Sequence, residues 1–149
     1  MSLEIQIMEQ LKTAMKAKDT IALESLRAIK SALLLAKTET GKSTELTEEQ
    51  EIAILQRLMK QRKEAAEQFA AQNRTELAEK ELAQSKIIVS FLPQQLSKEE
   101  ITTTIKEIIA ETGAKDAKDM GKVMGVASKK LAGKAEGKVI SEIVKMLLG

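Results

Sequence analysis

Cysteine and histidine are both absent from this 149-residue chain. Their absence excludes a thiol nucleophile, an imidazole base, a disulfide bond and a zinc site built from cysteine and histidine. The side chains left for chemistry are hydroxyls, lysines and carboxylates. We therefore expect no cofactor and no catalytic residues, and a protein that binds a partner rather than transforming a substrate.

Tryptophan and tyrosine are also absent, the aromatic residues are Phe69 and Phe91, and the one proline is Pro93. The chain is instead rich in alanine, leucine, glutamate, lysine, glutamine and methionine, which favour helices. Runs of β-branched and aromatic residues, which are typical of strands, are missing. The composition predicts an all-α protein, with an N-terminal antiparallel bundle of helical hairpins and a small C-terminal three-helix domain.

Long hydrophobic runs are missing too. No apolar stretch approaches the roughly 18 residues that suggest a membrane-spanning helix. Glu4 and Glu9 interrupt the first apolar pattern, so this segment is not expected to be a signal peptide. We expect no membrane association and a cytoplasmic location.

Four helices are expected before Pro93, over residues 3–18, 20–37, 48–73 and 76–91, with a polar break over 38–46. Ser2, Thr47 and Thr75 are expected N-caps, and Gln50 completes a capping box with Thr47. Apolar residues at intervals of three and four predict the buried face of each helix. These faces comprise Ile5, Met8, Leu11 and Met15 on the first, Ala22, Leu26, Ile29, Leu33 and Ala36 on the second, Ile52, Leu55, Met59, Ala66 and Phe69 on the third, and Leu77, Ile88 and Phe91 on the fourth.

Polar side chains interrupt the faces of the third and fourth helices. Arg62 falls on the apolar face of the third helix, and Glu81 and Gln84 fall on that of the fourth. One interpretation is that Arg62 and Glu81 face each other across a helical hairpin. The other is that each lies at the edge of its face and extends its charge into water.

Pro93 marks the expected domain boundary, because the residue before a proline leaves the helical region. The sequence thus predicts an N-terminal domain over 1–93 and a C-terminal domain over 94–149. Ser97 and Glu100 can cap the first C-terminal helix, and Gly113 can end it. Asp116 and Asp119 can begin the next.

Positive charge gathers in the C-terminal part of the chain. Residues 1–93 hold 14 basic and 14 acidic residues, whereas residues 113–149 hold eight lysines, no arginine and four acids. If residues 115–131 form one helix, four lysines fall within an arc of about 60°. These are Lys115, Lys118, Lys122 and Lys129.

Two glycines lie on one flank of this lysine stripe. Gly121 and Gly125 have no side chains, so the backbone of a partner could approach the helix there. Lys134, Gly137 and Lys138 follow, beside a helix N-terminus whose free N–H groups favour phosphate. A polyanion is therefore one expected ligand. The alternative is that the lysines simply face water and the glycines admit another helix of the same protein.

Three stretches resemble the YqeY family: FLPQQLSKEEI (91–101), GAKDAKDMGKVMG (113–125) and LAGKAEGKVI (131–140). The stretch LMKQRKEAAEQFAAQNRTELAEKE (58–81) is also similar to stand-alone members, so the resemblance spans nearly the whole chain. The family shares its C-terminal domain with the B subunit of the tRNA-dependent amidotransferase. Two positions differ from the family pattern, which usually has aspartate at Glu136 and serine near Ala117.

This resemblance implies a tRNA-binding role for the C-terminal domain, because the amidotransferase subunit grips tRNA with its counterpart. It also implies that the amide-transfer chemistry belongs to regions that this chain lacks. A partner in aminoacyl-tRNA metabolism would follow from the same resemblance. The stand-alone members have no firmly assigned activity.

Three functions are thus expected, in different classes. The first is a non-catalytic protein that binds tRNA or another RNA through its backbone, since residues for base stacking and base readout are scarce. The second is a protein-interaction module that docks on a translation-related enzyme through the glycine surface and some of its seven methionines. The third is a carbon–nitrogen ligase that uses glutamine as amide donor, which the resemblance alone suggests.

Overall fold

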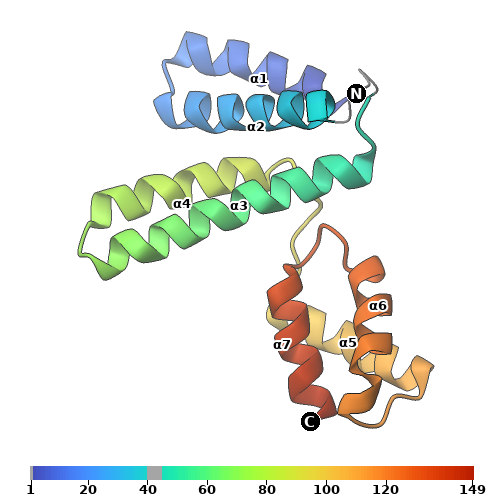
Figure 1. The fold of residues 1–149 in the computed structure, drawn as a ribbon. Helices are drawn as coiled ribbons and strands as arrows, with labels where there is room; N and C mark the ends of the chain where they lie inside the picture. Colours follow the sequence, from blue (N-terminus) through green and yellow to red (C-terminus); the bar gives the residue numbers. More distant parts are fainter. Residues whose placement is uncertain (1, 40–44) are drawn as a thin grey trace. The chain divides into compact units, whose positions relative to one another are not determined.

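A computed structural model describes residues 2–39 and 45–149 of the chain, and these residues form seven α-helices, one 3₁₀ turn and no strand (Figure 1). The predicted all-α class is confirmed. The chain divides into two compact units, Met1–Leu92 and Pro93–Gly149. Each unit has its own cluster of buried apolar side chains.

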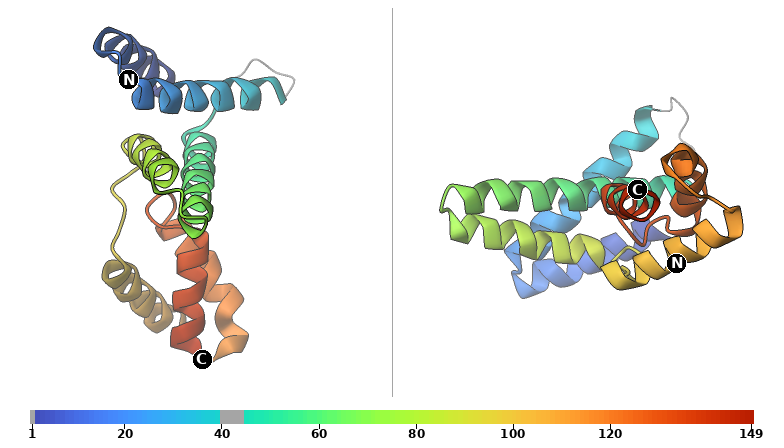
Figure 2. Two further views of the ribbon diagram at one scale, coloured as in Figure 1. Left: turned by 90° about the vertical axis from the view of Figure 1, so that its left-hand side faces the viewer. Right: turned by 90° about the horizontal axis from the view of Figure 1, so that it is seen from below.

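The first unit consists of two helical hairpins. Its helices are α1 (Leu3–Ala17), α2 (Thr20–Glu39), α3 (Glu48–Ala71) and α4 (Thr75–Val89). Helices α1 and α2 run antiparallel to each other, as do α3 and α4, and α2 packs across the second hairpin (Figure 2). Leu26, Ile29 and Leu33 of α2 lie in the centre of the core, between α1 and the second hairpin.

The N-caps show why these helices begin where they do. Ser2 accepts a hydrogen bond from the amide of Ile5, and Asp19 accepts one from the amide of Ala22. Thr47 and Gln50 form both hydrogen bonds of the predicted capping box, at 3.2 and 2.9 Å. The prediction for Thr75 is wrong, because this residue lies inside α4 and its helix has no side-chain cap. The expected polar break falls partly on residues 40–44, which lie outside the described residues.

The predicted buried face of α1 is largely wrong. Leu11 is buried, but Ile5, Met8 and Met15 are 51%, 46% and 52% exposed. The face that packs against α2 instead comprises Leu3, Ile7, Leu11 and Ala14. Helix α1 carries two apolar faces, and its angle of docking on α2 decides which of them enters the core.

The prediction for α4 fails at Leu77, which is exposed, while the next residue Ala78 is buried. Small residues are buried on both helices of the α3–α4 hairpin: Ala66 on α3, and Ala78 and Ser85 on α4. Small side chains let two helices approach closely, which leaves the bulkier leucine outside. Helix α4 also ends at Val89, so Phe91 lies beyond it and packs on the core from the following turn.

A polar network joins α2 to the second hairpin. Gln84, which is 5% exposed, donates to Glu24 Oε2 at 2.6 Å and accepts from Arg62 Nε at 3.1 Å. Lys80 pairs with Glu24 at 3.2 Å, and Arg62 lies 3.8 Å from Glu81. Arg62 and Glu81 thus face each other across the α3–α4 hairpin, and Gln84 connects their pair to α2.

Near the start of α3, partial burial raises the pKa of Glu51, and the carboxylates of Glu4 and Glu48 raise it further. A raised pKa in the folded state means that ionised Glu51 opposes folding. We expect Glu51→Gln to stabilise the protein by roughly 0.3–0.5 kcal/mol at pH 7, because the group is largely solvated. The gain should decrease as the pH falls through the raised pKa of Glu51 in the folded protein. It should vanish below the ordinary pKa of glutamate, about 4.3. Urea unfolding at pH 7 and pH 4 measures this, and an equal effect at both values would contradict it.

The second unit is a three-helix domain. It contains α5 (Lys98–Thr112), a 3₁₀ turn η1 (Ala117–Asp119), α6 (Met120–Lys130) and α7 (Gly137–Leu148). Ser97 caps α5, and Gly113 ends it in the left-handed conformation, as expected. The core centres on Ile105, Ile108 and Val123, together with Ile143 and Val144 of α7.

The segment that leads into α5 is tied to the turn between α6 and α7. The amide of Leu96 donates to the carbonyl of Lys134, and Gln95 Nε2 donates to the carbonyl of Gly133. Gly133 has a φ of 77°, a conformation that costs glycine little. These bonds fix the position of the turn at residues 131–136.

Candidate nucleic-acid interface

The predicted lysine stripe assumed one α-helix from residue 115 onward, and this assumption is wrong. The α-helix begins at Met120, with Lys115 in the preceding loop and Lys118 in the 3₁₀ turn. Asp116 accepts a hydrogen bond from the amide of Lys118 at 2.9 Å, and Asp119 accepts one from the amide of Lys115 at 3.0 Å. Aspartate bonds of this kind satisfy amides that a regular helix would otherwise use.

The six candidate lysines therefore form two groups, one at each end of α6. All six are exposed. Lys115, Lys118 and Lys122 lie around its beginning. Lys129, Lys134 and Lys138 lie around the α6–α7 turn, which Figure 1 shows at the opposite end of the helix. Since α6 has 11 residues, it spans about 16 Å.

One of the lysines has a structural contact. Lys122 Nζ lies 3.4 Å from the carbonyl oxygen of Thr112, at the C-terminus of α5. A cation at this end of a helix is stabilising. Lys130, which was not a candidate, pairs with Glu111 at 3.3 Å. Within the described residues, no ion pair is found for the other five candidate lysines.

The two glycines of α6 are open to solvent. A Cβ atom added at Gly121 or Gly125 would meet no heavy atom within 4 Å. The alternative that these glycines admit a helix of the same unit is therefore wrong. Gly125 lies between Lys122 and Lys129 on one face of α6, so the helix presents uncovered backbone between two ammonium groups.

Gly125→Ala should stabilise the protein by about 0.5–1 kcal/mol, because alanine favours a helix interior and its Cβ meets nothing here. Chemical denaturation of the variant measures this change. A loss of stability would show that the glycine has a structural role. A gain in stability would mean that Gly125 makes the fold less stable than alanine would.

The N-terminal turn of α7 adds a second electropositive element. Gly137 begins this helix, and a Cβ atom added there would also meet nothing within 4 Å. No acidic residue lies in the first turn, and the side chain of Glu136 makes no capping bond. The partial positive charge of the helix N-terminus therefore adds to the ammonium of Lys138.

Neither a metal site nor a membrane-spanning helix is found in the part of the chain that the structure describes. Its aspartates and glutamates form no group of three or more that could hold a metal ion. No helix in residues 2–39 or 45–149 is long and apolar enough to cross a membrane.

Sequence reasoning found the lysines and the glycines but missed how they are arranged. The signal for this arrangement is the pair of aspartates in DAKD (116–119), which is predicted to begin the helix. Asp116 does cap a helical turn, but this turn is the 3₁₀ turn Ala117–Asp119 that precedes α6. The contact of Lys122 with α5 left no signal in the sequence.

The chain matches a known protein family. A family model described as "Yqey-like protein" matches residues 4–148, nearly the whole chain. No curated protein matches the chain.

Proposed function

Since the chain belongs to the Yqey-like protein family, we propose that its second unit binds tRNA or a related structured RNA through the phosphate backbone. The observation that carries this proposal is the open face of α6. There, exposed backbone at Gly125 lies between Lys122 and Lys129, and no heavy atom lies within 4 Å of the place where a Cβ atom of residue 125 would be.

The chemistry of this surface favours backbone contacts. The chain has no tryptophan, tyrosine or histidine, and the second unit has no arginine, so base stacking and bidentate base readout lack suitable residues. Ammonium groups and exposed backbone amides bind phosphate regardless of sequence. We therefore infer recognition of RNA shape and charge. This unit resembles the C-terminal domain of the amidotransferase B subunit. Among structured RNAs, that resemblance supports tRNA as the ligand.

The positions of the serine and lysine side chains do not support amide-transfer chemistry. The two serines that precede a lysine in the sequence are Ser85 and Ser128. Ser85 is 3% exposed in the core of the first unit, where a substrate has no access. Ser128 is exposed, but adjacent residues on a helix do not face each other, so Lys129 is not its base.

The test is a titration of salt in the binding of fluorescent tRNA to the full chain. If about four phosphates are contacted, by Lys122 and the three lysines around the α6–α7 turn, affinity should fall roughly 50- to 150-fold between 50 and 200 mM salt, linearly on a double-logarithmic scale. RNAs of equal length and different sequence should bind with similar affinity.

Absence of binding at 50 mM salt would disprove the proposal, as would binding that salt does not weaken. Either result would identify the lysines as a solvated face. The protein-interaction hypothesis would then be the one to pursue.

A further inference from the structure

We propose that a groove between α1 and α2 in the first unit binds an acidic amphipathic helix of a partner protein. This surface is independent of the RNA-binding surface proposed above. Its starting observation is the apolar face of α1 that the core leaves exposed.

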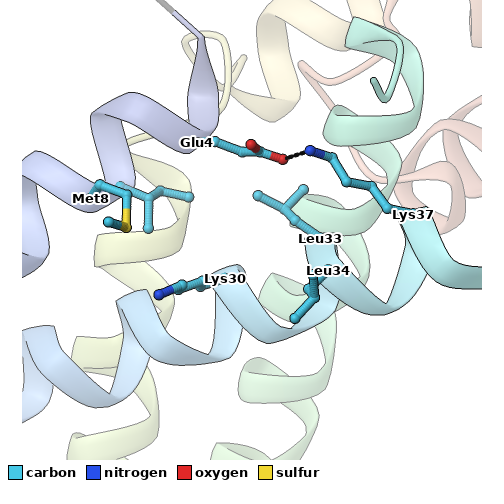
Figure 3. A pocket seen from close by; sticks show the side chains of 7 residues that line it. Glu4, Met8, Lys30, Leu33, Leu34 and Lys37 are labelled. Atoms are coloured by element: carbon cyan, nitrogen blue, oxygen red, sulfur yellow. Dashed lines mark ion pairs between the residues drawn. The ribbon is translucent and has the colours of Figure 1, made fainter. Parts of the chain in front are cut away.

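The groove contains a hollow of about 170 Å³ (Figure 3). Ile7 and Leu33 form its floor, and Met8 and Leu34 lie at its edges. A cavity of about 150 Å³ can hold a benzene-sized group, so this one can take a single leucine, methionine or phenylalanine side chain. Met8 is 46% exposed and Leu34 is 61% exposed, which leaves apolar area on both sides of the hollow uncovered.

The helical spacing extends this surface along the hairpin. Met8, Lys12 and Met15 are four and three residues apart on α1, so they form one row. Arg27, Lys30 and Leu34 are three and four residues apart on α2 and form another. Because the helices are antiparallel, the two rows run along the two sides of the groove. A partner helix of a few turns would contact both.

The charges around the groove specify an acidic partner. Within the described residues, Lys12, Arg27 and Lys30 belong to no ion pair, and all three are exposed. Three acids of the hairpin already have partners. Glu4 lies in the groove wall and is neutralised by Lys37, Glu24 pairs with Lys80, and Asp19 caps α2. Glu9 and Glu39 remain, but neither lies on the two rows. The groove therefore combines one apolar hollow with unpaired cations along its sides, which complements a helix bearing a leucine-type anchor and flanking carboxylates.

Three other occupants fit this surface less well. A second copy related by a two-fold axis would place the same cations against one another. A membrane favours a projecting apolar face, whereas this one is concave and carries the Glu4–Lys37 ion pair in its wall. RNA fits less well because the isoleucine and leucine side chains of the floor cannot form hydrogen bonds or ion pairs with it.

The test uses the full chain and two capped 18-residue helical probes. Both have leucines at positions i, i+3, i+4 and i+7; the flanking residues are glutamates in one and lysines in the other. We expect the glutamate peptide to bind at least tenfold more tightly than the lysine peptide in fluorescence anisotropy. The double variant R27E/K30E should weaken its binding about tenfold or more.

Leu34 and Leu35 supply a matched pair for the apolar contact, because both are exposed leucines of α2 on different sides of the helix. Leu34→Gln should weaken binding of the glutamate peptide about tenfold, and Leu35→Gln should leave it unchanged. Neither change removes a buried side chain, so both variants should fold.

Four outcomes would overturn the inference. These are equal binding of the two peptides, no binding up to about 1 mM, equal effects of the two leucine variants, and a dimer in sedimentation analysis that Leu34→Gln dissociates. A fifth is binding to phosphatidylserine vesicles that Leu34→Gln abolishes, since it would assign the surface to a membrane.

Discussion

Replacing Lys129, Lys134 and Lys138 together by glutamate is expected to weaken tRNA binding by more than about a hundredfold at 100 mM salt. The three lysines lie around the α6–α7 turn, are exposed, and have no ion-pair partner within the described residues. Each replacement removes one phosphate contact and adds one repulsive charge, so the effect exceeds simple neutralisation. The slope of log affinity against log salt should also become shallower by about 2 to 3.

The matched control replaces Lys86, Lys106 and Lys145 by glutamate. These lysines are also exposed. Lys86 belongs to α4 of the first unit, and Lys106 and Lys145 lie on α5 and α7 of the second unit, outside residues 129–138. The total change in charge is the same, so long-range repulsion of RNA is the same. If both triple variants lose affinity equally, binding depends on net charge alone, and the proposed surface is wrong.

Gln84→Leu is expected to destabilise the protein by about 2 kcal/mol, or roughly 30-fold in the folding equilibrium. The leucine has a similar size but leaves Arg62 Nε and Glu24 Oε2 without the partner that now lies 3.1 and 2.6 Å away. The remaining pairs with Lys80 and Glu81 do not replace these bonds, because they use longer contacts at the edge of the helices. Urea denaturation followed by circular dichroism measures the loss.

Gln61→Leu is the control for this prediction. Gln61 lies on α3, next to Arg62, but its side chain is exposed. Its replacement should change the stability by less than about 0.5 kcal/mol. Equal effects of the two variants would show that the network joining α2 to the second hairpin contributes little.

Local chemistry made the helix ends and the fold class predictable. A threonine followed three residues later by glutamine satisfies free amides wherever it occurs, and this is what Thr47 and Gln50 do. Gly113 ends α5 because glycine adopts the left-handed conformation readily. Such effects depend on neighbours in sequence, so no knowledge of the fold is required to predict them.

The sequence indicated which residues belong to the candidate surface but not how they are arranged in space. The lysines and glycines could be identified from the sequence, because charge and spacing are visible there. Their division into two groups depends on whether residues 116–119 join the helix, and two aspartate side chains decide against it. Side-chain bonds of this kind compete with the bonds of a helix, and apolar periodicity does not distinguish the two arrangements.

The sequence by itself determined that this protein is helical, that it has no cysteine or histidine chemistry, and that its basic residues gather after Gly113. Only the tertiary structure decided which apolar face of α1 is buried, that Gly121 and Gly125 are open, and that Gln84 joins three helices. The physical reason is that helix formation and charge depend on residue type and local spacing. Burial, by contrast, depends on how helices far apart in the sequence dock, and on α1 two apolar faces competed for one core.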